Sequence, residues 1–482
     1  MRLADHRRAR TAAIAVLGLA GPLLVGTGPA DATRSDATLP CLPVLGATLS
    51  GEAAVEDLGP GLAAAAAING MDSQKLSTIL TDDPTARLDR CARLFYVDPP
   101  MSAAERAAVA AAGPSGIAAP SGTDVFALNS RSASKRVIYL DFNGFTVKDT
   151  AWNSYYSSQF GSSRWLKGYD LDGKASTFST AEKNAIYEIW LRVSEDYAPF
   201  DVNVTTKDPG QSKITRSSSS DLYYGTRAVI THDSVFAAAC GCGGQAYVGV
   251  FDESSSHDYY QPALIVGSNG GGNAQSVAEA TTHEVGHNLG LSHDGISGSV
   301  EYYTGHGPWA PIMGAGYYHP VTQWSKGEYS GASNTEDDLA VVAKNGAARV
   351  KDDHANSSSS ATLLTVGKAK SGIIGSRYDN DWFTFTTASG VVTITLTPRT
   401  AGPNLDARVD LYKSSGTTLG WSNPTVKEVT DSSATGMNAK IVKVLSAGTY
   451  KVRVKGTGYG TVNSGYSTYG SLGRYTVKVA KA

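Results

Sequence analysis

Short apolar runs alternate with amphipathic stretches through the middle of the chain, a pattern typical of a mixed α/β domain. Residues 136–142 are rich in β-branched and aromatic side chains, which predicts a strand. Apolar residues recur at helical spacing within 180–197, which predicts a helix that Thr180 can cap. A second helix is expected over 274–291, after the glycine-rich turn 270–272. Further strands are expected at 200–206, 227–231, 246–251 and 263–267.

The last block, about 361–482, has almost no helical periodicity and consists of short strand-like segments separated by turn residues. This spacing predicts an antiparallel β-sandwich. Its strands are expected at 381–387, 391–397, 407–412, 441–445, 448–454 and 475–479. A polar, serine-rich stretch at 352–360 is interpreted as a linker. The expected fold class is therefore an α/β (α+β) domain at 123–350, with a twisted mixed sheet and one central helix, followed by an all-β sandwich.

The N-terminus has the pattern of an export signal. An arginine-rich start is followed by an apolar stretch from residue 11 to about 26, and Ala30 and Ala32 supply small residues for cleavage after Ala32. A membrane anchor is the alternative. The apolar run is shorter than the roughly 20 residues that a spanning helix needs, and Pro22 interrupts it. We therefore expect residues 1–32 to be a signal peptide and the protein to be secreted.

Residues 33–122 form a separate first block. It contains an alanine-rich helical stretch at 62–68, and residues 101–122 are rich in Ala, Pro, Ser and Gly, like an exposed, cleavable linker. One interpretation is a pro-segment that is removed on maturation, which would make the chain a zymogen. The other interpretation is a small, stable N-terminal domain.

Charge and cysteine content narrow the class of partner. The formal net charge of −2 provides no basic field for nucleic acid or an anionic membrane, and we expect neither as a partner. We expect a monomer. The four cysteines, Cys41, Cys91, Cys240 and Cys242, are an even and small number, which favours disulfides in an exported protein. Three pairings are possible, and proximity in the sequence favours Cys41–Cys91 and Cys240–Cys242.

One short segment carries the candidate chemistry. Three of the nine histidines in the chain, His283, His287 and His293, fall within one window of the expected helix and its exit. His283 and His287 are four residues apart, so they share one helix face and can reach one ion. Gly290 can adopt a left-handed conformation that ends the helix and lets the chain return His293 as a third ligand. Three nitrogen ligands leave a fourth position for water, which is typical of one catalytic zinc ion.

Glu284 lies next to the first of these histidines, where its carboxylate can face that open position. Zinc lowers the pKa of bound water towards roughly 7 and polarises a carbonyl group. We expect Glu284 to take a proton from the water and to pass it to the leaving amine.

The stretch 283–294 resembles the signature of the metzincin clan of zinc peptidases, and its last residue, Asp294, resembles that of the reprolysin-type branch. The resemblance implies a methionine-containing turn beneath the metal. Residues 311–314 are similar to that turn, with Met313 as the apolar base. Some metzincins carry a tyrosine ligand two residues after this methionine. Because this chain has Ala315 there, the resemblance does not extend to such a ligand.

The resemblance also implies a substrate site, because metzincins pair an extended peptide with an edge strand above the cleft. Residues 243–251 are the candidate strand, and a Cys240–Cys242 link would stiffen the loop before it. The alternative is a surface loop without a catalytic role.

The C-terminal block resembles the bacterial pre-peptidase C-terminal domain, a β-sandwich attached to secreted peptidases. Asp379, Asn380 and Asp381 could hold calcium there, or they could form a solvated turn. The residues that carry the resemblance are Asp381-Trp-Phe-Thr-Phe385, Asn404-Leu-Asp406, Leu411-Tyr412 and Ala447-Gly-Thr-Tyr450.

Cys91 or Cys41 could also block the zinc ion from the pro-segment as a cysteine switch, and a disulfide between the two is the alternative. The leading functional hypothesis is a secreted zinc endopeptidase that acts on protein or peptide substrates. The alternatives are a protein that binds surfaces or fibrous proteins through its C-terminal sandwich, with proteolysis secondary, and a zinc hydrolase of another amide such as a cell-wall linkage.

Overall fold

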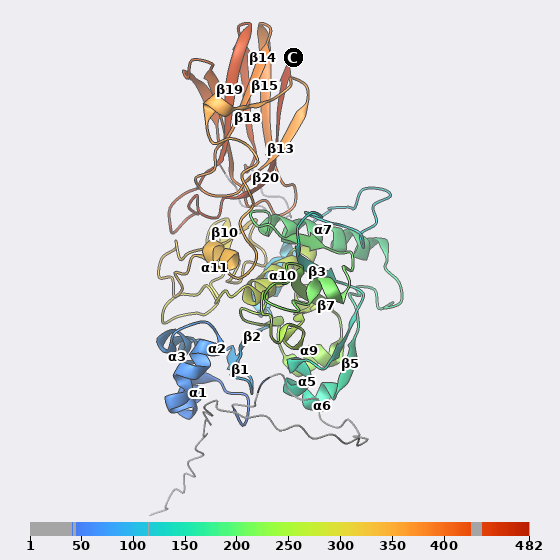
Figure 1. Ribbon diagram of the computed structural model, residues 1–482. Coiled ribbons are helices and arrows are strands. Elements are labelled where there is room, and N and C mark those ends of the chain that lie inside the picture. Colours follow the sequence, from blue (N-terminus) through green and yellow to red (C-terminus); the bar gives the residue numbers. More distant parts are fainter. Residues whose placement is uncertain (1–40, 42–44, 114, 426–435, 482) are drawn as a thin grey trace, which may run out of the picture.

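The computed structural model describes residues 41, 45–113, 115–425 and 436–481 of the chain (Figure 1). A helical block at the N-terminal end (blue) is followed by an α/β domain (green to yellow) and a β-domain (orange to red). The predicted signal peptide, 1–32, lies outside the described residues. Among the helices of the described part, none has the length and apolar character needed to cross a membrane.

The N-terminal block has a small core of its own. Its helices are α1 (Gly51–Leu58), η1 (Gly59–Gly61), α2 (Leu62–Ile68) and α3 (Ser73–Asp82), and α2 is the helix expected at 62–68. The strands β1 (Ala86–Leu88) and β2 (Leu94–Asp98) follow and pair with each other in antiparallel orientation. Leu58, Leu76, Leu80 and Leu94 are buried between these elements.

The first half of the expected linker at 101–122 forms a helix that was not expected, α4 (Ala103–Ala112). Ser102 and Glu105 make a reciprocal capping box: Glu105 N donates to Ser102 Oγ at 3.2 Å, and Ser102 N donates to Glu105 Oε2 at 2.6 Å. Alanine, which dominates the segment, is the best helix former. The described residues between 113 and 122 contain no helix or strand, so only this part matches the expected linker.

The α/β domain is built on a seven-stranded sheet with the order β1-β2-β8-β9-β7-β3-β6. The pairs β6–β3, β3–β7 and β7–β9 are parallel, whereas the pairs β9–β8, β8–β2 and β2–β1 are antiparallel. The two N-terminal strands are therefore part of the central sheet. The strands of this domain are β3 (Arg136–Asp141), β6 (Asn203–Thr205), β7 (Tyr224–Thr231), β8 (Gly244–Tyr247) and β9 (Ala263–Val266).

Strand β8 differs from the strand expected at 246–251. It begins two residues earlier and ends at Tyr247, because Gly249 adopts a left-handed φ of 64°. The chain then runs along the end of helix α10 (Ala274–Asn288), where Gly249 N donates to His287 O and Phe251 N donates to Asn288 O, both at 2.9 Å. Because β2 covers its outer side, β8 is an interior strand and not the expected edge strand.

Helices cover both faces of the sheet. On β9, Ala263 and Ile265 pack on the side of α10, and Leu264 packs on the opposite side with Trp152 and Phe236. Burial on both faces explains why these strands are continuously apolar in sequence. The helices are α7 (Thr180–Asp196) beside α10 on one face, and α5 (Ala151–Tyr155), α6 (Ser157–Phe160) and α9 (Ser234–Cys240) on the other.

Helix α7 begins at the expected residue, but Ser179 caps it, not Thr180. Glu182 N donates to Ser179 Oγ at 3.2 Å, which again forms a capping box. The other elements of the domain are β4 (Phe145–Lys148), β5 (Ser163–Leu166), α8 (Gln211–Ile214), η2 (His257–Tyr260), η3 (Asn269–Gly272), β10 (Trp309–Pro311), β11 (Val321–Gln323) and α11 (Asp338–Lys344).

The C-terminal domain is an all-β sandwich of two sheets, with the orders β12-β14-β19-β16-β17 and β13-β20-β15-β18. Each strand expected from the sequence is present, whereas β12, β13, β17 and the helical turn η4 (Ser358–Ser360) were not expected. The strands are β12 (Thr362–Leu363), β13 (Ala369–Ile374), β14 (Asp381–Thr387), β15 (Gly390–Pro398), β16 (Ala407–Lys413), β17 (Thr418–Ser422), β18 (Ala439–Leu445), β19 (Gly448–Gly456) and β20 (Gly473–Lys481).

Buried polar contacts join this sandwich to helix α7. The Glu195 carboxylate is fully buried and accepts from Arg474 N at 2.8 Å, with Arg474 Nη1 3.3 Å away. The Asp196 carboxylate accepts from Asn404 Nδ2 at 2.8 Å and from Thr282 Oγ1 of helix α10 at 2.6 Å. One hydrophobic core runs through both domains. The sandwich is therefore packed against the helices that carry the candidate chemistry.

Candidate metal centre

Helix α10 and its exit bring the three histidines together. His283 and His287 lie one turn apart on the helix, which ends at Asn288 and is three residues shorter than expected. Gly290 adopts a φ of 94°, and a Cβ atom there would overlap the Asn345 amide. That amide donates to Leu289 O at 2.7 Å and thus fixes the turn after the helix. As expected, a left-handed glycine lets the chain return towards the helix at His293.

Each imidazole ring is held by an outer partner at Nδ1. His283 Nδ1 donates to Ile312 O at 2.9 Å, and His287 Nδ1 donates to Leu291 O at 2.8 Å. His293 Nδ1 contacts the Asp83 carboxylate at 2.6 Å. Because carbonyl oxygens only accept hydrogen bonds, Nδ1 carries the proton and Nε2 presents a lone pair.

The three Nε2 atoms converge on a carboxylate that the sequence did not single out as a ligand. Asp98, the last residue of β2, places Oδ2 2.9 Å from His283 Nε2 and 3.8 Å from His287 Nε2. Its Oδ1 lies 3.3 Å from His293 Nε2. All four ligand atoms lie within 4.8 Å of one another, and all four residues are buried.

This arrangement fits a metal cation. In the tautomers set by Nδ1, the three Nε2 atoms have no hydrogen-bond donor to meet, and Asp98 adds a further acceptor to the same point. Four buried acceptors directed at one point repel one another unless a cation lies between them. Imidazole nitrogens with a carboxylate are ligands that zinc accepts. The cluster is therefore suited to bind a metal ion.

Glu284 of helix α10 lies beside this centre, and its side chain packs against Gly244 of strand β8. Gly244 is so close to it that a Cβ atom at this glycine would overlap Glu284 Oε1. The second oxygen, Oε2, is buried without a hydrogen-bond partner. Burial, together with the neighbouring Asp98 carboxylate, raises the pKa of Glu284 well above its usual range. The side chain is thus positioned to hold a proton next to the histidine cluster.

The electrostatics of Asp98 differ from those of Glu284. Burial opposes ionisation of Asp98, but His283 and His293 outweigh burial and hold its pKa well below the usual range. Burial also disfavours the charged form of His293, yet Asp83 and Asp98 raise the pKa of His293 to about 10, so a proton on its Nε2 competes with a metal cation for this position. The centre therefore holds Asp98 as an anion.

The turn at 311–314 lies below the helix, as the resemblance implied. Met313 is fully buried, and its Sδ would lie 2.6 Å from a Cβ atom at Gly286, so this glycine makes room for the methionine. Ile312 supplies the carbonyl that binds His283, and Asp294 N donates to Met313 O at 2.8 Å. The turn therefore supports both the helix and its exit.

Tyr302 is a further residue that sequence reasoning missed. Its hydroxyl contacts Asp98 Oδ1 at 2.9 Å and Thr85 Oγ1 at 3.0 Å, and its ring lies 4.2 Å from that of His293. No fixed spacing from the histidines identifies this position. Ala315 is buried beside the turn and offers no ligand atom.

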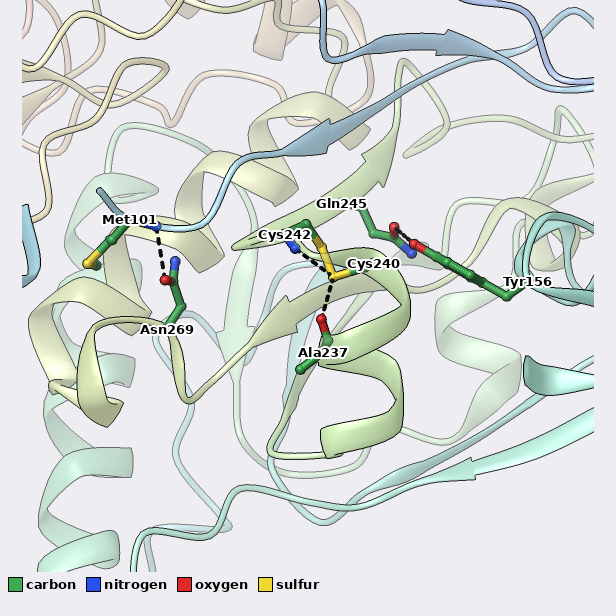
Figure 2. The surroundings of a disulfide bond; sticks show 7 residues. All are labelled: Met101, Tyr156, Ala237, Cys240, Cys242, Gln245 and Asn269. Atoms are coloured by element: carbon green, nitrogen blue, oxygen red, sulfur yellow. Dashed lines mark hydrogen bonds between the residues drawn. A yellow bond between two sulfur atoms is a disulfide. The ribbon is translucent and has the colours of Figure 1, made fainter. Parts of the chain in front are cut away.

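All four cysteines form disulfides, in the pairs Cys41–Cys91 and Cys240–Cys242. The first pair leaves no free thiol for a cysteine switch. The second closes the loop between α9 and β8, next to Gln245, which accepts from Tyr156 OH at 2.6 Å (Figure 2). Figure 2 also shows Met101, three residues after Asp98, whose N–H donates a hydrogen bond of 3.0 Å to Asn269 Oδ1.

The candidate calcium residues lie at the start of β14. Asp379 and Asp381 are buried and cluster with the exposed Asp352, whereas Asn380 Nδ2 donates to Tyr378 O at 2.8 Å. Asp379 and Asp381 are thus more buried than a solvated turn implies, and calcium binding by these residues stays a prediction.

Comparison with known proteins identifies the domain around this centre. Residues 189–294 match the family model described as metallo-peptidase family M12B, reprolysin-like. The chain therefore carries a reprolysin-like metallopeptidase domain, which makes the protein a hydrolase of peptide substrates. No curated protein matches the chain.

Several solved structures are similar to about a quarter of the chain. The pre-peptidase C-terminal domain of a collagenase from Bacillus anthracis is 14% identical with a TM-score of 0.18, covering 25% of this chain and 93% of that one. CorA, a surface-associated copper-binding protein of Methylomicrobium album, is 10% identical with a TM-score of 0.18, covering 25% and 98%. The periplasmic lysozyme inhibitor PliG of Aeromonas hydrophila is 14% identical with a TM-score of 0.15, covering 24% and 97%.

Proposed function

We propose that this chain, with its reprolysin-like metallopeptidase domain, is a secreted zinc endopeptidase that cleaves extended segments of proteins. The observation that carries the proposal is the convergence of three imidazole Nε2 atoms, with the buried Glu284 carboxylate close to the first residue of strand β8, Gly244. Three protein nitrogen ligands, with a fourth position open to water or substrate, are typical of catalytic zinc.

His283, His287 and His293 would hold the zinc ion, and their Nδ1 partners would fix the ring orientations. A bound zinc ion supplies Lewis acidity and lowers the pKa of water. Glu284 would accept a proton from the attacking water and deliver it to the nitrogen of the leaving group. Since Gly244 approaches Glu284 so closely, the strand that would bind the substrate also restricts the carboxylate to one position.

Strand β8 supports an extended peptide as the substrate. Its outer side already forms main-chain hydrogen bonds with an extended segment of the same chain: Val248 N donates to Leu94 O at 2.9 Å, and Gly243 N donates to Asp98 O at 2.8 Å. A substrate that replaced this segment would gain the same bonds by strand addition. Such bonds do not depend on free chain ends, which favours cleavage inside a protein.

The decisive test is cleavage of casein and of a peptide library by the purified protein after a limited cut within residues 113–122. We expect activity that a chelator abolishes and zinc restores. Glu284→Ala should lose activity while it retains zinc, because Glu284 is not among the clustered ligand atoms. Full activity of this variant would refute the proposed role of Glu284.

Secretion is a separate part of the proposal and rests on the pattern of residues 1–32. We expect the protein in the culture medium, and N-terminal sequencing of the exported chain should begin at Thr33. Retention of the intact N-terminus on cell membranes would favour the anchor instead.

The C-terminal sandwich supports a second candidate function, the binding of a surface or a fibrous protein. In the register of the sheet, Trp382, Arg453, Asp410 and Trp421 lie directly opposite one another across four strands. Trp421 is 59% exposed, and Arg408 lies over its ring at 4.6 Å. Exposed aromatic residues interleaved with arginine are enriched at binding surfaces. Co-sedimentation of the inactive Glu284→Ala protein with insoluble proteins, compared with Glu284→Ala/Trp421→Ala, would test it.

A further inference from the structure

The strand β2 lies in the groove that the proposed function assigns to the substrate. It pairs antiparallel with β8, with Phe95 opposite Tyr247 and Asp98 opposite Gly244. The last bonded residue of the strand, Asp98, thus lies at the histidine cluster. Pro99 and Pro100 follow, and neither can donate a main-chain hydrogen bond, so the pairing stops here.

The side chain of Asp98, and not its main chain, faces the cluster. Its carboxylate oxygens lie 2.9 Å from His283 Nε2 and 3.3 Å from His293 Nε2. Its carbonyl oxygen is turned towards β8, where Gly243 N donates to it at 2.8 Å. The bond between Asp98 and Pro99 is therefore not presented for attack. Strand β2 thus occupies the position of a substrate, but it does not direct a peptide bond at the histidine cluster.

Other residues of the N-terminal block fix this arrangement. The Asp83 carboxylate binds His293 Nδ1 at 2.6 Å, and Thr85 binds the Tyr302 hydroxyl that also contacts Asp98. The Tyr96 ring lies 4.5 Å from the ring of His287 and 4.2 Å from that of His293. One block of the chain therefore supplies a carboxylate to the cluster, a partner for one histidine and a cover for two rings.

From this geometry we infer that Asp98 is the latency group of this enzyme: its carboxylate takes the fourth ligand position of the metal and excludes water until the N-terminal block is released. The inference rests on the proposed function for the identity of the metal and the reaction. It also assigns residues 45–112 the role of an inhibitory pro-segment. Release requires a cut after α4 and removal of β1 and β2 from the sheet, which leaves β8 as an edge strand.

The test uses the uncut, full exported chain loaded with cobalt(II), so that ligand changes are visible without turnover. The variants are Asp98→Ala, Asp98→Asn, which keeps the side-chain shape, and Asp57→Asn, a matched control on the exposed side of α1. The probe is acetohydroxamate, a small chelating anion. A cavity of about 370 Å³ lies beside the cluster and is lined in part by Asp83, Tyr96 and His293.

We expect both Asp98 variants to change the cobalt absorption spectrum and to bind acetohydroxamate at least tenfold more tightly than the wild-type and Asp57→Asn chains. The uncut variants should still not cleave peptide, because β2 continues to occupy strand β8. If the uncut wild-type chain binds the probe as tightly as both variants do, Asp98 does not block the metal and the inference is wrong.

Two further outcomes separate the inference from the proposed function. If the cut wild-type enzyme cleaves peptide but both uncut Asp98 variants keep the wild-type spectrum and weak probe binding, the strand alone causes latency and the role of Asp98 is refuted. If both variants bind the probe tightly but the cut enzyme cleaves no protein or peptide, the role of Asp98 as a metal ligand stands and the proposed endopeptidase function fails.

Discussion

Replacement of Gly244 by alanine should inactivate the enzyme without removing its metal. A Cβ atom at this position would overlap Glu284 Oε1 and would lie 2.6 Å from Glu284 Cδ and 2.8 Å from Cγ. Real Cβ contacts are almost never shorter than 3.0 Å, so either the Glu284 side chain or strand β8 must move. The strand is paired on both sides, with β2 or a substrate on one and β9 on the other, so the side chain is the part that yields.

The size of the effect follows from the displacement. To reach an ordinary contact, the carboxylate must move by roughly 1 Å, and a misplacement of this size can cost about 100-fold in rate. That factor corresponds to about 2.7 kcal/mol of transition-state free energy. The overpacking should also lower the free energy of unfolding by about 1–3 kcal/mol. Since Glu284 is not one of the clustered ligand atoms, zinc content should not change.

The assay compares kcat/KM on a quenched peptide for the cut wild-type enzyme and the Gly244→Ala enzyme, with bound zinc measured in the same samples. Gly420→Ala is the matched control, because Gly420 is also a strand glycine and no atom lies within 4 Å of its added Cβ. A kcat/KM within threefold of wild type at equal zinc content would refute the reasoning, because Glu284 would then not depend on the space that Gly244 provides.

Three further predictions concern stability. Glu195→Ala should lower the free energy of unfolding by about 3–5 kcal/mol, because Arg474 and Arg399 lose their buried partner. Calorimetry should show the sandwich melting before the α/β domain, and a single transition at the wild-type temperature would contradict this prediction. Burial raises the pKa of Asp406 to about 7, so the folded state holds a proton that the unfolded chain loses near pH 4. Between pH 4 and 7, the free energy of unfolding of the wild type should thus fall by about 4 kcal/mol more than that of Asp406→Asn. Urea denaturation at each pH measures both values, and the same pH dependence in the two proteins would refute the prediction. Gly286→Ala should destabilise by about 1–3 kcal/mol through Met313, which urea denaturation measures against Gly420→Ala; equal midpoints would count against that contact.

Local patterns predicted the elements whose signals are contained in a few consecutive residues. Strand β14 has the expected bounds because its alternation of buried and half-buried residues is complete within Asp381–Thr387. The helix of the histidine motif ends where Gly290 requires it to. Helix α4 was missed although Ser102 and Glu105 carry the capping signature, because alanine, proline and glycine together suggested a linker.

The fourth group at the metal could not be predicted in this way. Asp98 reaches the histidines only because β2 pairs with β8, and the apolar pattern of a strand does not identify its partner. The same pairing overturns the expectation that β8 is an edge strand, which rested on the resemblance to metzincins. Tyr302 likewise gains its position from the Asp98 carboxylate and Thr85, both of which belong to the N-terminal block.

The two ends of the chain therefore act on the active-site helix in different ways. The N-terminal block contacts the functional faces of the histidines, and its bonds are those that a substrate can replace. The C-terminal sandwich acts through helix α7: Asn404 donates to Asp196 of α7, and Asp196 also accepts from Thr282, the residue before His283. A substrate makes none of these latter bonds, and a cut within residues 113–122 leaves them intact. Loss of the first block should thus expose the metal, whereas loss of the sandwich would leave a buried carboxylate without its partner and weaken the helix that holds the metal.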